Sequence, residues 1–434
     1  MPGLNRLSAT EAARKLAARE ITAEALVDDC LERIAQRDPQ VRAWTCVDPS
    51  GARNRARALD RSASRGLLHG VPIAVKDLLD TVDMPTCYGS PIYANHRPAW
   101  DAAAVAIARA AGAIVLGKTV TTEFATFHPG PTRNPHNVAH TPGGSSSGTA
   151  AAVADFMVPV GFGTQTAGSI VRPAAFCGVV GYKPTYGTVC RVGGKMISDT
   201  LDTTGCIART VADVALFIAV LADRPELTVD DSPTQASPRV GFCRTYEWDQ
   251  AQPETVAAFE AARRGLERAG AKVRDVALPR TFAGLVDAQL AVMQHEVASS
   301  LAYERLHHRD RLSDDMTAMI DAGLGVSKRQ YDAARSLARD CRAQLAEVFG
   351  DIDVLIAPSA HGEAPGGMAT GNPLFQRAWT LLHTPCVHLP TARGPRGLPV
   401  GITAVGRIDG DAALLRAAAW IHDRLGGPET TAVA

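Results

Sequence analysis

The sequence has no long uninterrupted apolar run and no excess charge of either sign. Its longest apolar stretch, GTAAAVADFMVPVGFGTQTAG, contains Asp155, Pro159 and several glycines, which argues against a membrane span. Lysine plus arginine number 45, and aspartate plus glutamate also number 45, so the formal net charge is zero. Because a neutral chain has no broad electrostatic field, we expect neither nucleic acid nor a membrane as its partner.

Cysteine pairs of the CxxC type are also missing. The nine cysteines are scattered and odd in number, which argues against a disulfide framework or a zinc site. We expect most of them to be small buried thiols in a reducing compartment. The start of the chain, MPGLNRLSATEAARKLAARE, has no apolar segment typical of a secretory signal. These features predict a cytoplasmic protein.

Strand-like and helix-like segments alternate in the first part of the chain. Two helices are expected up to about Asn54, and Ser8 with Glu11 fits a capping box at the start of the first. The segment HGVPIAVKDLLD predicts a buried strand that ends at Lys76. The segment AAVAIARAAGAIVLGKT predicts a helix followed by a strand. This alternation is typical of an α/β fold.

A stretch rich in Gly, Ser and Thr occupies residues 134–210. Its apolar segments AAAVA, VPVGF and FCGVVGY indicate a loop-rich but buried centre. The segment SPTQASP, at 232–238, resembles a surface linker. A strand in VGFCR, a long helical region from about Pro253 to Phe349, and strands in DIDVLIAPS and GLPVGITAVG are expected after it.

Two serine-bearing stretches are candidates for chemistry: TPGGSSSG and GTQTAGSIVRPAAFCG. The first lacks the lysine of a phosphate-binding GxxxxGK[ST] loop, and by itself it is typical of a flexible turn. In the second, small residues precede Ser169, so successive backbone N–H groups can converge on one anion. Acyl transfer needs this arrangement, because the hydroxyl attacks a carbonyl and the amides bind the resulting oxyanion.

A serine nucleophile also needs a base, because its hydroxyl is a weak nucleophile at neutral pH. No GxSxG elbow is present, and the two histidines of HNVAH lack the glutamate of HExxH and are expected in a loop. Lys76, at the end of VPIAVK, is the stronger candidate, since burial can lower the ordinary lysine pKa of about 10.4 by several units. The alternative is a charged Lys76 paired with Asp77 or Asp80.

Lys76 in AVKD, Ser145 in GGSSSG and Ser169 in GTQTAGS together resemble the Ser–cisSer–Lys triad of the amidase signature family. The 24-residue separation of the two serines matches that family. Further segments that resemble it are HGVPIAVKDLLD, GKTVTTEFA, GVVGYKPTYG and LDTTGCIART. The pattern looks closest to the malonamidase-like small-amide hydrolases.

The resemblance implies one compact α/β domain over 1–434, with a large mixed sheet flanked by helices on both faces. Within it we expect N-terminal helices in 1–65, the signature core in 66–225, a helical middle segment in 239–350 and the C-terminal part of the core in 351–434. Members of the family commonly form homodimers, so the resemblance leaves a homodimer open.

The resemblance also implies a role for each site residue. Lys76 is the base, Ser145 relays the proton, and Ser169 attacks the amide carbon to form an acyl-enzyme. The peptide bond before the bridging serine is cis in the family, and here that bond is Gly144–Ser145. The oxyanion hole is expected at the backbone N–H groups of Thr166, Ala167, Gly168 and Ser169. Neither a metal ion nor an organic cofactor is needed.

Three positions near the nucleophile bear on the substrate. Ala167 stands where many members have glycine and would be strained at a positive φ. Gln165 occupies a position that is often aspartate. Arg172, three residues after Ser169, resembles an arginine that binds a substrate carboxylate in malonamidase-like members. The alternative for Arg172 is a structural ion pair.

The sequence therefore predicts an enzyme that hydrolyses a linear, non-peptide C–N bond in a small, carboxylate-bearing amide and releases ammonia or an amine. One alternative is the amidase subunit of a glutamyl-tRNA amidotransferase, which works with a partner. Its SNLxRYDGVRYG stretch is absent from this chain. Another alternative is a non-catalytic binding or scaffold protein of the same fold, against which the intact Lys76, Ser145 and Ser169 argue.

Overall fold

An 11-stranded mixed sheet runs through the molecule in the order β1-β3-β2-β4-β6-β5-β10-β11-β9-β7-β8. The computed structural model describes residues 3–62, 66–229 and 237–426. Its strands are β1 (Trp44–Val47), β2 (Pro72–Lys76), β3 (Ile114–Thr119), β4 (Val160–Gln165), β5 (Val180–Lys183), β6 (Thr203–Ala208), β7 (Arg239–Phe242), β8 (Lys272–Asp275), β9 (Val354–Pro358), β10 (Cys386–Arg393) and β11 (Pro399–Val405). The sheet is mixed: β2 is parallel to β3 and β4, while the central strands from β4 to β9 pair antiparallel.

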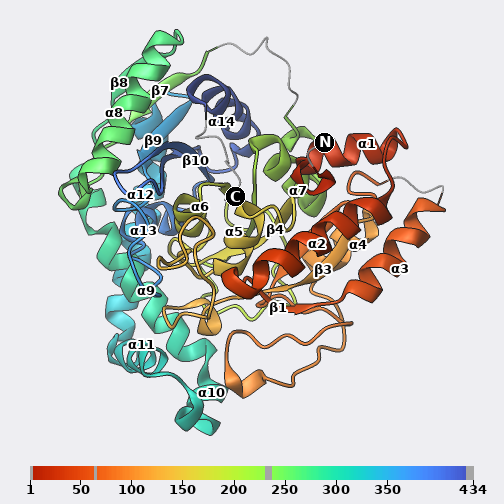
Figure 1. The fold of residues 1–434 in the computed structure, drawn as a ribbon. Coiled ribbons are helices and arrows are strands. Elements are labelled where there is room, and N and C mark those ends of the chain that lie inside the picture. Colours follow the sequence, from red (N-terminus) through yellow and green to blue (C-terminus); the bar gives the residue numbers. More distant parts are fainter. Residues whose placement is uncertain (1–2, 63–65, 230–236, 427–434) are drawn as a thin grey trace.

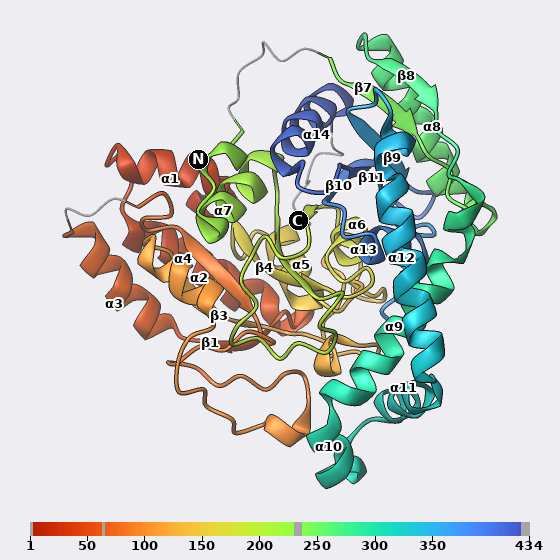
Figure 2. The same cartoon turned by 180° about the vertical axis from the view of Figure 1, so that it is seen from behind.

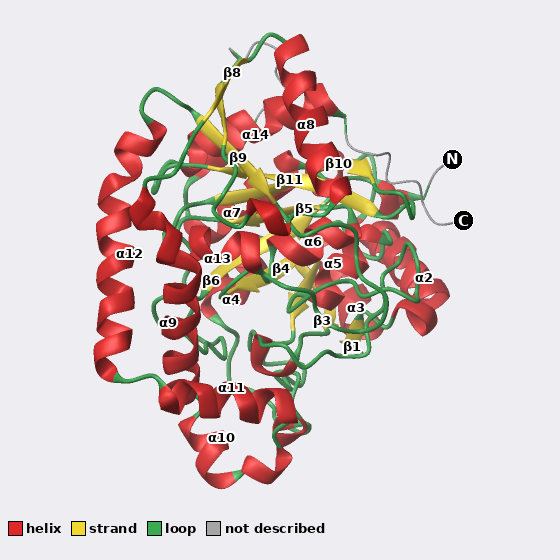
Figure 3. Ribbon diagram, turned by 90° about the vertical axis from the view of Figure 1, so that its left-hand side faces the viewer, coloured by secondary structure: helices red, strands yellow, loops and turns green. Residues whose placement is uncertain are grey.

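Helices surround this sheet (Figures 1 and 2). They are α1 (Ala9–Ala17), α2 (Ala23–Val41), α3 (Pro49–Asp60), α4 (Ala103–Ala110), α5 (Ser147–Ala154), α6 (Val171–Cys177), α7 (Val211–Ala222), α8 (Pro253–Arg268), α9 (Leu285–Ser300), α10 (Ala302–His307), α11 (Asp314–Gly325), α12 (Lys328–Phe349), α13 (Leu374–Leu381) and α14 (Asp411–Leu425). Figure 3 shows α9 and α12 side by side at one edge of the molecule, with α10 and α11 beyond their ends.

Strand β6 shows that helices cover both faces of the sheet. A side chain at Gly205 would point at Ile170, at the start of α6, whereas the thiol of Cys206 reaches the Val214 carbonyl of α7. Because neighbouring strand residues point to opposite faces, α6 and α7 lie on opposite sides. The predicted α/β fold with a mixed, doubly covered sheet is confirmed.

The expected capping box is present, while two expectations are wrong: the number of helices before Asn54 and the unbroken helical region from Pro253 to Phe349. Ser8 and Glu11 form the capping box. A third helix, α3, begins before Asn54, because Asp48 caps it and a proline occupies its first turn. The long helical region is interrupted by β8, a strand rich in charge that pairs with β7 at the edge of the sheet. Of the expected linker at 232–238, residues 232–236 lie outside the described residues.

The serine-rich centre of the chain is buried, as its apolar segments predict. Every residue of α5 and α6 is buried, so neither helix has a solvent-exposed face. Gly148, in the first turn of α5, lies directly against backbone, and a Cβ atom there would collide with the Ala43 carbonyl and the Val120 amide. Close backbone packing of this kind fixes the start of α5, and with it the segment that carries Ser145.

No helix in the three described ranges combines the length and apolarity that a bilayer crossing requires.

The first residue of α14, Asp411, ties the C-terminal helix to the sheet. Its carboxylate accepts hydrogen bonds from the Tyr182 hydroxyl at 2.5 Å, the Thr185 amide at 2.9 Å and the Thr185 hydroxyl at 2.5 Å. The residue is fully buried, and its negative charge lies at a helix N-terminus, where the helix dipole favours it.

Replacing Asp411 by Ala should therefore lower the free energy of unfolding by about 3 kcal/mol, because three donors lose their acceptor in the core. Denaturant unfolding followed by circular dichroism measures the change. Asp423→Ala, an exposed position on the same helix, is the matched control and should shift stability by no more than about 0.5 kcal/mol. Equal effects of the two substitutions would contradict this role of Asp411.

Candidate active site

Lys76 is fully buried at the end of β2, and its amine binds two hydroxyl groups. Nζ lies at hydrogen-bond distance from two hydroxyl oxygens, 2.8 Å from Ser145 Oγ and 2.7 Å from Thr164 Oγ1. Burial lowers the pKa of Lys76 to about 7, partly offset by the negative charge of Asp202. Near neutral pH a substantial share of Lys76 is therefore uncharged, and a neutral amine can accept a proton.

The acidic residues next to Lys76 have other partners. Asp77 lies 3.3 Å from the amine of Lys118, which is itself fully buried. Asp80 accepts a hydrogen bond from the Tyr88 hydroxyl at 2.7 Å. The structure thus differs from the alternative in which Lys76 pairs with one of these carboxylates. Lys118 neutralises Asp77, and Lys76 is left among hydroxyls.

The three consecutive serines occupy distinct places. Ser145 is bound to Lys76, and the Gly144–Ser145 peptide bond is cis. Ser146 Oγ accepts from the Thr164 amide at 3.3 Å, and Ser147 Oγ donates to the Val120 carbonyl at 3.3 Å. Ser146 and Ser147 therefore fasten the loop to the neighbouring strands, while the Ser145 hydroxyl is directed to the amine.

Ser169 joins this group through the backbone, since the Ser146 amide donates to the Ser169 carbonyl at 3.3 Å. The carbonyls before it are also occupied by donors. Gln289 Nε2 donates to the Thr166 carbonyl at 2.9 Å, and Thr380 Oγ1 to the Ala167 carbonyl at 2.7 Å. These bonds turn the carbonyl oxygens of the loop toward the surrounding protein.

The amide groups of the same loop are unoccupied. Within the described residues, the N–H groups of Ala167, Gly168 and Ser169 make no hydrogen bond, and neither does the Ser169 hydroxyl. Ala167 does not adopt a positive φ, so its methyl group causes no backbone strain. A row of free amides beside a free hydroxyl can bind an oxyanion next to a nucleophile.

Gln165 shapes this loop from within the protein. Its side-chain oxygen accepts from the Ile170 amide at 2.9 Å and the Val171 amide at 3.1 Å, and its Nε2 donates to Thr380 Oγ1 at 3.0 Å. The side chain is fully buried. Gln165 therefore caps the start of α6 and holds the turn that presents Ser169.

Arg172 is buried and has no carboxylate partner in the described part of the chain. Nη2 donates to the Gly144 carbonyl at 2.7 Å, but Nε and Nη1 are buried without a hydrogen-bond partner. Burial and the positive charge of Arg377 lower the pKa of Arg172 to about 9. Burial also lowers the pKa of Arg377 to about 10. This differs from a structural ion pair, because no carboxylate among the described residues neutralises the buried Arg172 guanidinium.

Three residues of the site are not among those predicted from the sequence: Thr164, Gln289 and Arg377. Thr164 is one residue before Gln165 and binds Lys76. Arg377, in α13, donates to Gln289 Oε1, and Gln289 in α9 in turn holds the Thr166 carbonyl. Arg377 stands in the apolar segment FQRAWTLL, and an arginine in such a segment could have been singled out from the sequence, because buried arginines are uncommon. Gln289 carried no such signal.

The described residues hold no cluster of three or more His, Cys, Asp or Glu side chains placed to bind a metal ion. The two histidines of HNVAH lie in a loop. His136 contacts the Cys177 carbonyl and His140 the Ala364 carbonyl, each through a ring nitrogen.

Comparison with known proteins decides the family. The Amidase family model matches residues 25–415. The chain belongs to the amidase signature family. Among curated relatives, this amidase is 34% identical to a glutamyl-tRNA(Gln) amidotransferase subunit of Salinispora arenicola, over 98% of this chain and 99% of that one. The alignment runs to 488 positions against a chain of 434 residues, so dozens of positions in that relative have no counterpart here.

Solved structures agree with this assignment. The peptide amidase of Stenotrophomonas maltophilia is 30% identical to this amidase, with a TM-score of 0.81 and 97% of each chain covered. An inhibitor-bound structure of a vestigial protein complex, connected with the origins of an s-triazine catabolic enzyme, is 26% identical. Its TM-score is 0.87, and the match covers 96% of this chain and 100% of that one.

The depressed pKa of Lys76 predicts a pH-dependent contribution to stability. The unfolded chain binds a proton at Lys76 up to its ordinary pKa of 10.5, whereas the folded chain releases it at about 7. Protonation therefore favours unfolding between these values, and Lys76 should add stability as the pH rises from 7 toward 10.5. Urea unfolding of the wild type and of Lys76→Met measures the difference at each pH. A difference independent of pH would show that the amine keeps its proton in the fold.

Proposed function

We propose that this amidase hydrolyses the C–N bond of a small, carboxylate-bearing amide through a Ser169 acyl-enzyme. The observation that carries the proposal is the buried pair Arg172 and Arg377 beside the serine loop, where Arg172 has unpaired donors and no carboxylate of the described residues neutralises it. A substrate carboxylate would supply the missing negative charge. Guanidinium groups bind carboxylates through two parallel hydrogen bonds, which would also orient the amide toward Ser169.

The proposed reaction uses the hydroxyl chain that starts at Lys76. The neutral amine takes the proton of Ser145, Ser145 takes that of Ser169, and Ser169 Oγ bonds to the amide carbon. The amides of residues 166–169 bind the oxyanion of the tetrahedral intermediate. Ser145 then returns a proton to the leaving nitrogen, so ammonia or an amine departs and the ester of Ser169 is left. Water attacks that ester, the same relay takes up its proton, and the carboxylic acid is released.

Thr164 would position the base in this scheme. Its hydroxyl and that of Ser145 are the hydrogen-bond partners of the Lys76 amine among the described residues. A second hydroxyl restricts where the lone pair of the amine points, and so keeps it directed at Ser145.

A second candidate is the ammonia-releasing subunit of a glutamyl-tRNA amidotransferase, and the curated relatives favour it. Several of them carry the name of that amidotransferase and match this chain over nearly its whole length. Glutamine is itself a small amide with a carboxylate, so the two candidates share the chemistry of the site. They differ in two respects: the amidotransferase subunit works with a partner protein, and its ammonia is passed on rather than released. The absent SNLxRYDGVRYG stretch favours an enzyme that acts without the amidotransferase.

A homodimer and a cytoplasmic location complete the proposal. The homodimer comes from the family resemblance. The location rests on the nine cysteines, all of which are free thiols. Free thiols in this number persist in a reducing compartment.

The purified chain alone should release ammonia from malonamate or a similar carboxylated amide. Ser169→Ala should abolish the reaction, and Lys76→Ala should lower kcat by about a thousandfold or more, because the relay acts as a unit. Ammonia release is measured by a coupled assay, and the acyl-enzyme by mass spectrometry of the intact protein. Activity on glutamine that appears only with an amidotransferase partner would instead establish the second candidate. Near-normal turnover in Lys76→Ala would remove the assigned base.

The arginine pair makes a separate prediction about substrates. Arg377→Lys and Arg172→Lys should each raise KM for malonamate by about tenfold or more, since each loses a forked contact to the carboxylate while keeping a positive charge. Neutral malonamide, which has no carboxylate, is the matched control substrate and should be hydrolysed with an unchanged KM. Steady-state kinetics measures KM for malonamate and for malonamide in each variant. Equal losses on the two substrates would assign the arginines to the structure of the loop.

A further inference from the structure

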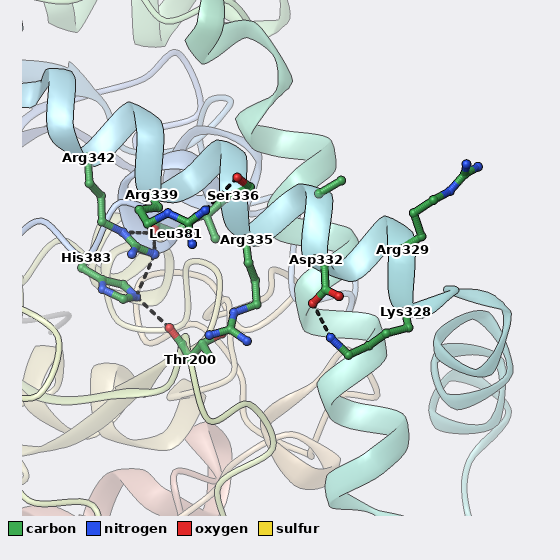
Figure 4. A pocket seen from close by; sticks show the side chains of 11 residues that line it. Thr200, Lys328, Arg329, Asp332, Arg335, Ser336, Arg339, Arg342, Leu381 and His383 are labelled. Atoms are coloured by element: carbon green, nitrogen blue, oxygen red, sulfur yellow. Dashed lines mark hydrogen bonds and ion pairs between the residues drawn. The ribbon is translucent and has the colours of Figure 1, made fainter.

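A second concave site, here called the α12 groove, lies outside the catalytic loops (Figure 4). It has a volume of about 990 Å³ and is formed by one face of α12 together with Thr200, Leu381 and His383. Its cationic side chains are Lys328, Arg329, Arg335, Arg339 and Arg342. None of these residues belongs to the hydroxyl relay, the oxyanion loop or the Arg172–Arg377 pair.

Positive charge in the α12 groove is largely uncompensated. The acidic residue that lines it, Asp332, is already paired with Lys328. The four arginines of the groove have no carboxylate within ion-pair distance anywhere in the described ranges. Arg335 and Arg339 are exposed, and Figure 4 shows their side chains extending along the groove from successive turns of α12.

The inner end of the groove is held rigidly. Arg342 Nε and Nη2 donate to the Leu381 carbonyl at 3.2 and 3.0 Å, and His383 Nε2 lies 2.8 Å from the Thr200 carbonyl. Burial and the positive charges of Arg335 and Arg339 lower the pKa of Arg342. The hydrogen bonds hold the Arg342 guanidinium near the like charges of Arg335 and Arg339, and a bound anion would reduce this repulsion.

The cations are arranged as a stripe. Lys328, Arg335, Arg339 and Arg342 recur at spacings of three, four or seven residues, so they lie on one face of the helix. From Lys328 to Arg342 the stripe is about 21 Å long at 1.5 Å per residue. An extended peptide of about six residues has the same length. A single small anion would occupy only part of the groove.

We propose that the α12 groove binds an extended acidic segment of a protein partner, with aspartate and glutamate carboxylates paired to Arg335, Arg339 and Arg342. A nucleic-acid strand fits less well. The aromatic rings near the groove already have partners. Tyr331 stacks on His295 and contacts Lys328 and Arg335, and Tyr186 stacks on His383 and contacts Arg191, so these rings are less available to stack with bases.

The test uses a fluorescein-labelled hexaglutamate peptide and the full-length protein, with fluorescence anisotropy as the readout. The peptide should bind, and the affinity should fall as salt is raised, since the contacts are ionic. Arg335→Ala/Arg339→Ala should weaken binding by about tenfold or more. The same double variant should keep its amidase activity, which shows that it is folded and that the groove is distinct from the catalytic site.

Arg264→Ala/Arg268→Ala is the matched control, because it removes two exposed arginines at the same spacing from another helix, α8. It should leave peptide binding unchanged. Equal weakening by both double variants would show a general charge effect and overturn the proposal. So would the absence of peptide binding, or binding of a hexanucleotide RNA at least as tight as that of hexaglutamate. If amidase activity fails while peptide binding behaves as expected, only the proposed function falls.

Discussion

The Lys76 amine lies in the core of the sheet with two hydroxyl groups as its partners, and much of the surrounding structure follows from that placement. A charged ammonium group without a carboxylate partner is costly to bury, so the fold favours the neutral amine. Neutrality turns an ordinary lysine into a base. The packed start of α5 and the hydroxyl of Thr164 fix the groups that the amine contacts.

A carboxylate paired with Lys76 would have kept its amine charged. Asp77 follows Lys76 directly, yet it pairs with Lys118 from the adjacent strand β3. Asp77 lies in the turn that follows β2, and there its carboxylate lies 3.3 Å from the Lys118 amine. A second lysine thus lies next to the carboxylate of Asp77, and burial without a carboxylate partner lowers the pKa of Lys76 to about 7. At Arg172 no such partner is present among the described residues, and two of its nitrogens are buried without a hydrogen bond; we propose that a substrate carboxylate binds them.

The sequence predicted the parts of the site that are local and missed those that come from distant segments. Ser145, Ser169 and Lys76 stand in short segments whose composition indicates a buried strand or a tight turn. Arg377 and Gln289 reach the oxyanion loop from α13 and α9, and no local pattern shows which helix faces that loop. Strand β8 was missed because its KVRD segment is charged and lies at the sheet edge, where apolar alternation is not required.

The family assignment narrows the chemistry to reactions at an amide C–N bond. In the proposed mechanism the nitrogen leaves the tetrahedral intermediate as the Ser169 acyl-enzyme forms. Whether the site can perform that step depends on the protonation of one amine. A neutron crystal structure at pD 8 would show it directly. We predict two deuterons on Lys76 Nζ, with its lone pair directed at the Ser145 hydroxyl deuteron. Three deuterons on Nζ, in an undistorted and buried site, would contradict the claim that Lys76 is the base.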